Sequence, residues 1–471
     1  MPNKPSIRSL LAAALAANAS SALGVETVPR YLAEEAVVVV TDAVSGPAPA
    51  VFGGLQRQGN PGFRGSVANG ALVVGRVDES SEAARAGLRE GDVIEAIDGR
   101  AFSKAHIGQD LLETLKGDEP VSLRIRRDGR AVNVAFTPPP RDWEQLSGLE
   151  AEYGVLETSD GARLRTIVTR PRGADSPLPA VFMIQWVGCS SLEFQHEGPW
   201  LMVYKGVAER SGLAMIRVER SANGDSEGPP CHQLDMNTER MHYDEAFEVL
   251  TRHPWVDRDR VVLMGNSLGT KMVPLVAHGK LLAGAITSSG GGLSYFERMV
   301  NFDRHALSHE DRDPAEAHDI LMAQMPFQVM YLLEGKTPEQ IVAERPDLEG
   351  VWETIAHTGD GHHYGRPYAY HHQAARQDYV EAWAVLEAPI LVNFNQYDQF
   401  EELRGAELIV DTVNRLRPGT ATLAVHAQLG HSFRRYASQL DAYAYRDGEP
   451  GHEVALAVIL DWLEQHVPLT D

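Results

Sequence analysis

The sequence predicts an α/β protein in two parts, with a mostly parallel sheet covered by helices in the longer C-terminal part. Three observations support this fold class. After residue 148, short apolar runs alternate with helical segments, as in strands joined by crossover helices. Residues 71–137 instead read as short strands and turns with short helices at 81–88 and 107–115, and Pro138–Pro140 separates the two regions. The length of 471 residues also exceeds what one hydrophobic core usually organises.

The charge and the N-terminus limit the classes of function. The formal net charge is −22 and no long Lys/Arg cluster occurs, so nucleic-acid binding is not expected. No segment approaches about 18 consecutive apolar residues, so no transmembrane helix is predicted. The opening "MPNKPSIRSLLAAALAANASSALG" has the parts of a signal peptide but equally fits an alanine-rich helix. Residues 1–60 are interpreted as a leader or helical segment and linker, and both a cytoplasmic and an exported location stay open.

Residues 80–102 carry a pattern of glycines and apolar residues: "AGL" at 86–88, "GDVI" at 91–94 and "DG" at 98–99. Glycines permit tight turns, and core contacts are expected from Leu88, Val93, Ile94 and Ile97. The stretch resembles the signature of bacterial PDZ domains and implies such a domain over residues 61–140. PDZ domains bind an extended peptide or the C-terminus of a protein at a sheet edge, with the carboxylate-binding loop expected near residues 63–74. A purely structural role beside the second domain is the alternative.

The run "VVLMGNSLGT" (261–270) ends an apolar strand with a serine between Gly265 and Gly269. G-x-S-x-G alone is common, but here a predicted strand precedes it and a predicted helix follows. That context favours a sharp strand-to-helix turn that presents Ser267 as a nucleophile. An ordinary turn would explain the glycines but not the strand and the helix.

A serine nucleophile needs a base and an acid to orient that base. Asp398 follows the apolar strand "PILVNFNQY", and His431 follows a glycine after the next predicted strand. Glu401 and Glu402 are alternatives for the acid. His426 is the alternative base, although its place within an apolar strand favours a core histidine.

These features resemble the α/β-hydrolase superfamily of serine hydrolases over residues 148–471. The resemblance implies a catalytic triad of Ser267, Asp398 and His431. It also implies an oxyanion hole formed by the backbone N–H groups of Leu268 and of Trp186 or Val187.

The loop after the strand "PAVFMI" departs from the family pattern, because Gln185 and Trp186 replace the usual His-Gly. Gln185 is therefore a candidate pocket residue. Cys189 and Cys231 would lie on adjacent loops at the catalytic end of the sheet, where they could form a disulfide. Free thiols are the alternative, particularly in a cytosolic protein.

Residues 294–387 interrupt the alternation of strands and helices and are interpreted as an inserted cap. Its segment "HTGDGHHYGRPYAYHHQ" (357–373) is rich in histidine and tyrosine. Adjacent histidines do not project together on a helix, and no H-E-x-x-H pattern accompanies them. A polar aromatic wall is therefore favoured over a metal site. Arg366 and Tyr368 are candidates for the substrate pocket, with Arg366 recognising a carboxylate.

The resemblance implies an enzyme that cleaves a carboxylic ester or thioester of a small-molecule or peptide substrate through an acyl-enzyme, without a cofactor. The peptidase branch of the family often carries a β-propeller, which the sequence lacks, so an esterase is favoured. Acyl transfer and peptide hydrolysis use the same triad and stay open. So does a catalytically inactive protein whose function is PDZ binding.

Overall fold

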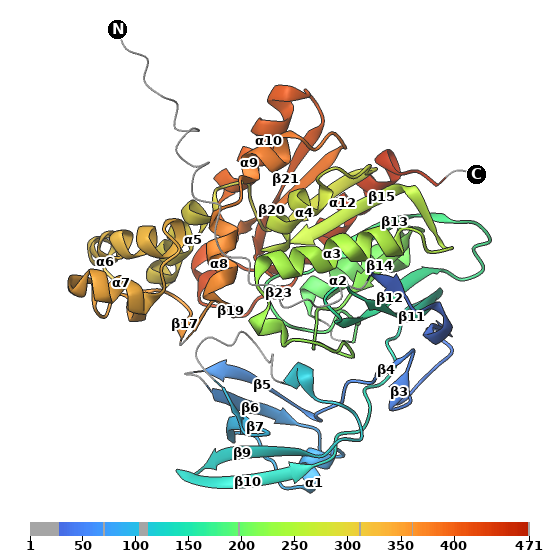
Figure 1. Ribbon diagram of the computed structural model, residues 1–471, viewed down its shortest axis with the longest axis horizontal. Coiled ribbons are helices and arrows are strands. Elements are labelled where there is room, and N and C mark those ends of the chain that lie inside the picture. The colour runs from blue at the N-terminus through green and yellow to red at the C-terminus, as the bar shows by residue number, and fades with distance from the viewer. Residues whose placement is uncertain are drawn as a thin grey trace.

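A computed structural model describes residues 28–68, 71–102, 112–195, 198–309, 312–359 and 361–469. Within them a large mixed sheet carries helices on both faces, and a smaller antiparallel sheet lies beneath it in Figure 1. The predicted fold class is confirmed. The leader-like residues 1–27 and most of a helix expected near residues 107–115 lie outside the described residues.

The smaller sheet has the strand order β10-β9-β7-β6-β5, with β8 paired to β7, and all its pairs are antiparallel. Leu88, Ile94 and Ile97 are buried in its core, as expected, while Val93 is only partly buried. Its elements are β5 (Phe63–Ala68), β6 (Ala71–Val77), α1 (Glu82–Arg85), β7 (Val93–Ile97), β8 (Arg100–Ala101), η3 (Leu112–Thr114), β9 (Val121–Arg127) and β10 (Arg130–Phe136).

Residues 28–60, expected to act largely as linker, are instead part of the folded structure. The strands β1 (Arg30–Tyr31) and β2 (Val37–Val40) both pair with β11 (Leu149–Glu157) of the large sheet. A hairpin of β3 (Val51–Phe52) and β4 (Leu55–Gln56) follows. These strands have only two to four residues, too few to produce a readable alternation.

The large sheet follows the order β11-β12-β14-β13-β15-β16-β20-β21, in which β11 and β12 form an antiparallel hairpin at one side. The six strands from β14 to β21 run parallel. The carboxyl ends of these strands therefore meet at one edge, where catalytic loops gather in open α/β sheets. The remaining strands are β12 (Arg163–Pro171), β13 (Leu178–Ile184), β14 (Ala214–Val218), β15 (Val256–Asn266), β16 (Gly284–Ser288), β20 (Ile390–Tyr397), β21 (Ala421–Gly430), β22 (Arg434–Arg435) and β23 (Glu449–Pro450).

Both faces of the parallel strands are buried, which explains their nearly continuous apolar sequences. Along β13, Phe182 and Ile184 face one core, whereas Val181 and Met183 face the other. The first core receives α3 (Met236–Leu250), α4 (Gly269–Ala277) and α10 (Leu403–Leu416), and the second receives α2 (Pro199–Arg210) and α12 (His452–His466). None of the described helices is both long and apolar enough to cross a bilayer.

The connection between β16 and β20 forms a mainly helical cap, whose helices α5, α6 and α7 extend at one side in Figure 1. Helix α6 continues into one turn of π-helix, η5. The cap consists of α5 (Tyr295–His309), α6 (Pro314–Gln328), η5 (Val329–Leu333), α7 (Pro338–Glu344), η6 (Pro346–Leu348), η7 (Trp352–Thr354), β17 (Thr358–Gly359), β18 (His362–His363), β19 (Arg366–Pro367), α8 (Tyr368–Ala375) and α9 (Tyr379–Ala384).

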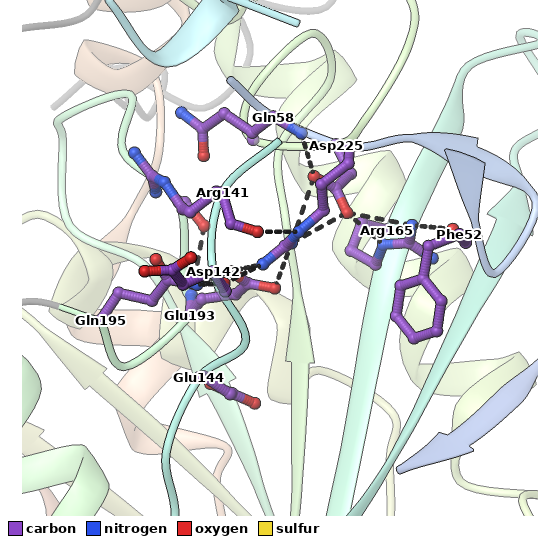
Figure 2. A network of polar contacts seen from close by, with 12 residues as sticks. Phe52, Gln58, Arg141, Asp142, Glu144, Arg165, Glu193, Gln195 and Asp225 are labelled. Atoms are coloured by element: carbon purple, nitrogen blue, oxygen red, sulfur yellow. Dashed lines mark hydrogen bonds and ion pairs between the residues drawn. The ribbon is translucent and has the colours of Figure 1, made fainter. Parts of the chain in front are cut away.

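A network of buried charges joins the N-terminal region to the large α/β unit. The guanidinium of Arg57 donates to Glu193 at 2.7 Å and to Asp225 at 3.2 Å. Asp225 also accepts from Arg165 of β12. Figure 2 shows Asp225 between Gln58, from whose backbone N–H it also accepts, and Arg165. All four charged side chains are almost completely buried.

The smaller domain itself touches the loop that follows β13. The Glu113 carboxylate accepts from the backbone N–H of Ser191 at 3.1 Å and from the Gln58 side chain at 2.8 Å. Lys116 donates to the Gly224 carbonyl on the loop after β14. Two loops at the carboxyl edge of the sheet are therefore held partly by the smaller domain.

The Asp225 carboxylate should be a large contributor to stability. Burial alone would raise its pKa, but the charges of Arg57 and Arg165 hold the pKa below its ordinary value. Replacement Asp225→Asn leaves the buried Arg165 without its counter-charge and Arg57 with Glu193 alone. We expect it to lower the free energy of unfolding by about 3–5 kcal/mol in denaturant titrations. Glu82→Gln, which breaks the exposed pair with Arg85, is the control and should have no measurable effect. Equal effects of the two substitutions would contradict this interpretation.

Candidate active site

The turn after β15 places Ser267 in a left-handed backbone conformation, with φ of 51°. This conformation is rare for residues other than glycine and is typical of a strained functional position. Gly269 is required by close packing, because a Cβ there would lie 2.8 Å from the carbonyl oxygens of Ile184 and Gln185. A Cβ at Gly265 would similarly meet Val273 at 2.7 Å. The two glycines flanking the serine thus allow β13, β15 and α4 to meet.

Ser267, His431 and Asp398 form one hydrogen-bonded series. The Oγ of Ser267 lies 3.0 Å from Nε2 of His431, and Nδ1 of His431 lies 2.8 Å from both carboxylate oxygens of Asp398. The backbone N–H of His431 also donates to Gln399 at 2.7 Å. This geometry would let the imidazole accept the serine proton while the carboxylate fixes the ring.

The alternative acids and base have other partners. Glu401 accepts from the buried Arg298 at 2.9 Å, and Glu402 lies 2.7 Å from His305. Asp398 is further fixed by the backbone N–H groups of residues 400 and 401, each at 2.9 Å. His426 lies 3.0 Å from Asn393 within the sheet, and burial lowers its pKa to about 4. It therefore has the environment of a core histidine.

Aromatic rings enclose the imidazole. The rings of Trp200 and Phe400 meet His431 edge-on, with centroid separations of 4.9 and 4.7 Å. Trp186 lies nearly parallel to Trp200 and against Gly188. Ser267 and His431 are only 4% and 7% exposed. Low exposure limits competition from bulk water and strengthens the electrostatic interactions within the site.

The two expected sources of oxyanion donors lie next to each other. Leu268 immediately precedes α4, and its backbone N–H has no backbone acceptor among the described residues. The Gln185 carbonyl packs against Gly269, so the loop after β13 touches the start of α4. The Gln185 side chain does not extend freely into a pocket, since its amide nitrogen donates to the Ser190 carbonyl at 2.7 Å.

Arg366 and Tyr368 occupy places different from those expected of substrate-binding residues. Arg366 is fully buried, and its guanidinium lies 3.1 Å from Glu239. It therefore faces protein groups, and recognition of a substrate carboxylate by this arginine is not supported. Tyr368 lies within the cap, where its hydroxyl group contacts the backbone of Gly359 and Gly361.

Cys189 and Cys231 are joined by a disulfide that closes a sequence separation of 42 residues. It links the loop after β13 to η4 (Cys231–Gln233). The sequence suggested this pairing only as one of two alternatives.

The cap histidines pack among aromatic rings. His363 and His371 are fully buried, with ring centroids 4.7 Å apart, and burial lowers the pKa of both. His371 also lies 2.8 Å from the Tyr295 hydroxyl. In the part of the protein that the structure describes, no group of three or more His, Cys, Asp or Glu side chains is arranged to hold a metal ion.

Comparison with protein families identifies the N-terminal region. Residues 21–137 match the family model described as the PDZ domain. This part of the protein therefore contains a PDZ domain. The match begins well before residue 61, although β1 and β2 in that stretch pair with β11 of the large sheet.

Comparison with solved structures finds many resemblances that cover about two thirds of the protein. The Pyrococcus furiosus esterase Pf2001 is 10% identical over 67% of this chain and 91% of its own, with a TM-score of 0.41. The α/β hydrolase GrgF from Penicillium sp. sh18 is 16% identical over 67% of this chain and 99% of its own, with a TM-score of 0.40. Resemblances this distant do not indicate a function, which therefore rests on the geometry of the site. No curated protein matches the sequence.

Three residues near the loop after β13 belong to no recognisable sequence motif. Arg220 follows β14, while Glu239 and Tyr243 lie one turn apart on α3, and all three are buried. They contact the backbone of the loop after β13 or the arginines bound to it. Of the three, only Arg220 could have been placed near the site from the sequence, because it follows a predicted strand.

Lys271 lies one turn after Ser267 in α4 and is buried. Its ammonium group donates to the Leu293 carbonyl and lies 4.4 Å from the centre of the Tyr379 ring. Burial lowers the pKa of Lys271 from 10.5 to about 7. Above pH 7 the unfolded protein therefore binds more protons here than the folded protein, so this group makes stability rise with pH.

We expect Lys271→Met to abolish the increase in the free energy of unfolding that Lys271 contributes above pH 7. Between pH 7 and pH 9, the free energy of unfolding of the parent should increase relative to that of the variant by about 2 kcal/mol. Denaturant titrations at the two pH values measure this difference. Lys280→Met, at a lysine paired with Asp244 near the surface, should retain the pH dependence of the parent. A parallel pH dependence for the parent and Lys271→Met would show that the buried lysine keeps an ordinary pKa.

Proposed function

We propose that this protein is a serine hydrolase that cleaves a carboxylic ester or thioester through an acyl-enzyme. The observation that carries the proposal is the series of contacts from Ser267 through His431 to Asp398. The left-handed turn at Ser267 and the adjacent Leu268 amide support it. Each group has the role that the triad chemistry requires.

In the first half of the reaction, Oγ of Ser267 attacks the carbonyl carbon while Nε2 of His431 takes the hydroxyl proton. The carbonyl oxygen becomes an oxyanion, stabilised by the Leu268 N–H and by an N–H from the loop after β13. Collapse of the tetrahedral intermediate breaks the bond to the leaving group, which receives the proton from His431. Asp398 stabilises the imidazolium throughout.

In the second half, His431 takes a proton from water as the water oxygen attacks the acyl carbon. The second tetrahedral intermediate expels Ser267, which regains its proton from His431, and the free acid leaves. The products are the acid and the alcohol or thiol, so one water is consumed and no cofactor enters the balance. An amine or alcohol in place of water would give acyl transfer, and an amide substrate would give peptide hydrolysis.

The PDZ domain supports a separate proposal, that of peptide binding. Strand β5 stands at the edge of its sheet with β6 on one side, and an extended peptide could add to such an edge as another strand. The domain also contacts the loop after β13 through Glu113. A bound peptide or protein C-terminus would therefore lie on a domain that touches the catalytic unit directly.

Intact-mass spectrometry after treatment with a fluorophosphonate probe tests the proposed hydrolase. We expect a single covalent adduct on the parent and none on Ser267→Ala, because only a serine activated by His431 reacts rapidly. Asp398→Asn should lower kcat for p-nitrophenyl acetate by about 10⁴-fold, since an amide at this position would favour the wrong tautomer of the imidazole. Ser308→Ala, at an exposed serine of the cap, should label like the parent.

Two results would contradict these assignments. Folded parent protein that forms no adduct would contradict the hydrolase and leave peptide binding by the PDZ domain as the function to examine. Asp398→Asn with full activity would remove Asp398 from the triad.

A further inference from the structure

The loop Gln185–Gly188, which follows β13, has its carbonyl groups fixed by two buried arginines. Arg220 donates to the Gly188 carbonyl at 2.7 Å and to the Gln185 carbonyl at 3.3 Å. Arg366 donates to the Val187 carbonyl at 2.9 Å. Three of the four carbonyl groups in the expected oxyanion loop therefore accept from guanidinium groups.

These contacts fix the peptide units that carry the N–H groups of Trp186, Gly188 and Cys189. In a trans peptide unit the carbonyl and the following N–H lie on opposite sides of the backbone. Because Arg220 holds the Gln185 carbonyl, the Trp186 N–H is directed away from that arginine. Neither the Trp186 N–H nor the Val187 N–H has a backbone acceptor among the described residues.

Glu239 connects the two arginines. One of its carboxylate oxygens lies 2.6 Å from Arg220, and the other lies 3.1 Å from Arg366. Tyr243, one turn further along α3, accepts from the Gln185 backbone N–H at 3.1 Å. A single face of α3 therefore fixes both arginines and the start of the loop.

We infer that Arg220 and Arg366, bridged by Glu239, are positioning residues that hold the loop ready to bind the oxyanion, with the Trp186 N–H as its second donor. This inference rests on the proposed hydrolase function. It also assigns Arg366 a role: the residue acts on the loop backbone and touches no substrate atom.

The two arginines and Glu239 are buried, which strengthens the electrostatic interactions among them. Arg366 is 0% exposed, and Arg220 and Glu239 are nearly as inaccessible. Burial alone would raise the pKa of Glu239, but the charges of both arginines lower it below its ordinary value. The carboxylate therefore stays charged, and the arginines can offer their remaining N–H groups to the loop carbonyls.

The cap takes part in the same arrangement. Arg366 belongs to β19 of the cap, and its guanidinium also donates to the Cys231 carbonyl at 2.8 Å. Cys231 is bonded to Cys189, which directly follows the loop. This arginine of the cap is therefore connected to the oxyanion loop through both a hydrogen bond and the disulfide segment.

Arg366→Lys, compared with Arg217→Lys, tests the inference. Arg217 is equally buried and is also paired with a carboxylate, that of Glu144 at 2.7 and 2.8 Å. It donates to the Leu192 carbonyl, outside Gln185–Gly188. Lysine cannot reproduce the forked contacts of arginine at either site. Both variants should therefore lose thermal stability to a similar extent.

The two variants should differ in catalytic activity. For p-nitrophenyl acetate we expect Arg366→Lys to lose about 10²-fold in kcat with little change in KM, as when an oxyanion donor is misplaced. Its rate constant for labelling by the fluorophosphonate should fall in parallel. Arg217→Lys should stay within about threefold of the parent in both measurements. The pH at half-maximal kcat/KM should be unchanged in both, since His431 and Asp398 are untouched.

Tyr243→Phe gives a second test if Arg366→Lys does not fold. Removing one hydroxyl group frees the Gln185 N–H and should lower kcat about tenfold, as expected for one lost hydrogen bond. Tyr204→Phe is its control, because the buried Tyr204 hydroxyl has no hydrogen-bond partner among the described residues.

Two outcomes would overturn the inference. If the parent is active and Arg366→Lys and Arg217→Lys lose activity to the same extent, Arg366 merely supports the fold. A parent that neither labels at Ser267 nor hydrolyses the ester would overturn the proposed function and the inference together.

Discussion

The arrangement of the candidate active site depends on the close contact between the end of β13 and the start of α4. Only glycine at position 269 permits it, because a Cβ would lie 2.8 Å from two carbonyl oxygens of the neighbouring strand end. The contact sets the Leu268 amide beside the loop after β13. It also fixes the turn on which Ser267 adopts its left-handed conformation. The distance from Ser267 to His431 follows from this placement and from the strand order, which brings the ends of β15, β20 and β21 to one edge.

Buried arginine–carboxylate pairs surround this centre and define how its loops are held. Arg57 fixes Glu193 and Asp225, whereas Arg220 and Arg366 share Glu239. Such pairs add little net stability compared with apolar packing, but an unpaired member is costly. Their geometry therefore favours one loop conformation over others. Through Arg57 and Glu113 the N-terminal region contacts the loop after β13, so the PDZ domain helps to support the carboxyl edge of the parallel strands.

The fold was largely predictable from the sequence because parallel strands buried on both faces give apolar runs of readable length. The turn at Ser267 was predictable for a related reason, since its glycines lie between a strand and a helix. His431 and Asp398 followed from their positions after later strands. Residues 28–60 could not be assigned, because β1 to β4 are too short for periodicity and the buried Arg57 reads as a polar loop residue. Arg366 looked like a residue for binding substrate. Its partner Glu239 comes from a distant helix, and only folding brings the two together.

The most direct test of the proposed active site is a crystal structure of the protein after reaction with a fluorophosphonate. We predict phosphorus bonded to Oγ of Ser267, with one phosphonyl oxygen within hydrogen-bonding distance of the N–H groups of Leu268 and Trp186. The carbonyl groups of Gln185 and Val187 should remain on Arg220 and Arg366. An adduct on another residue would contradict the assignment of the nucleophile. A phosphonyl oxygen turned away from Trp186 would contradict the assignment of the oxyanion loop.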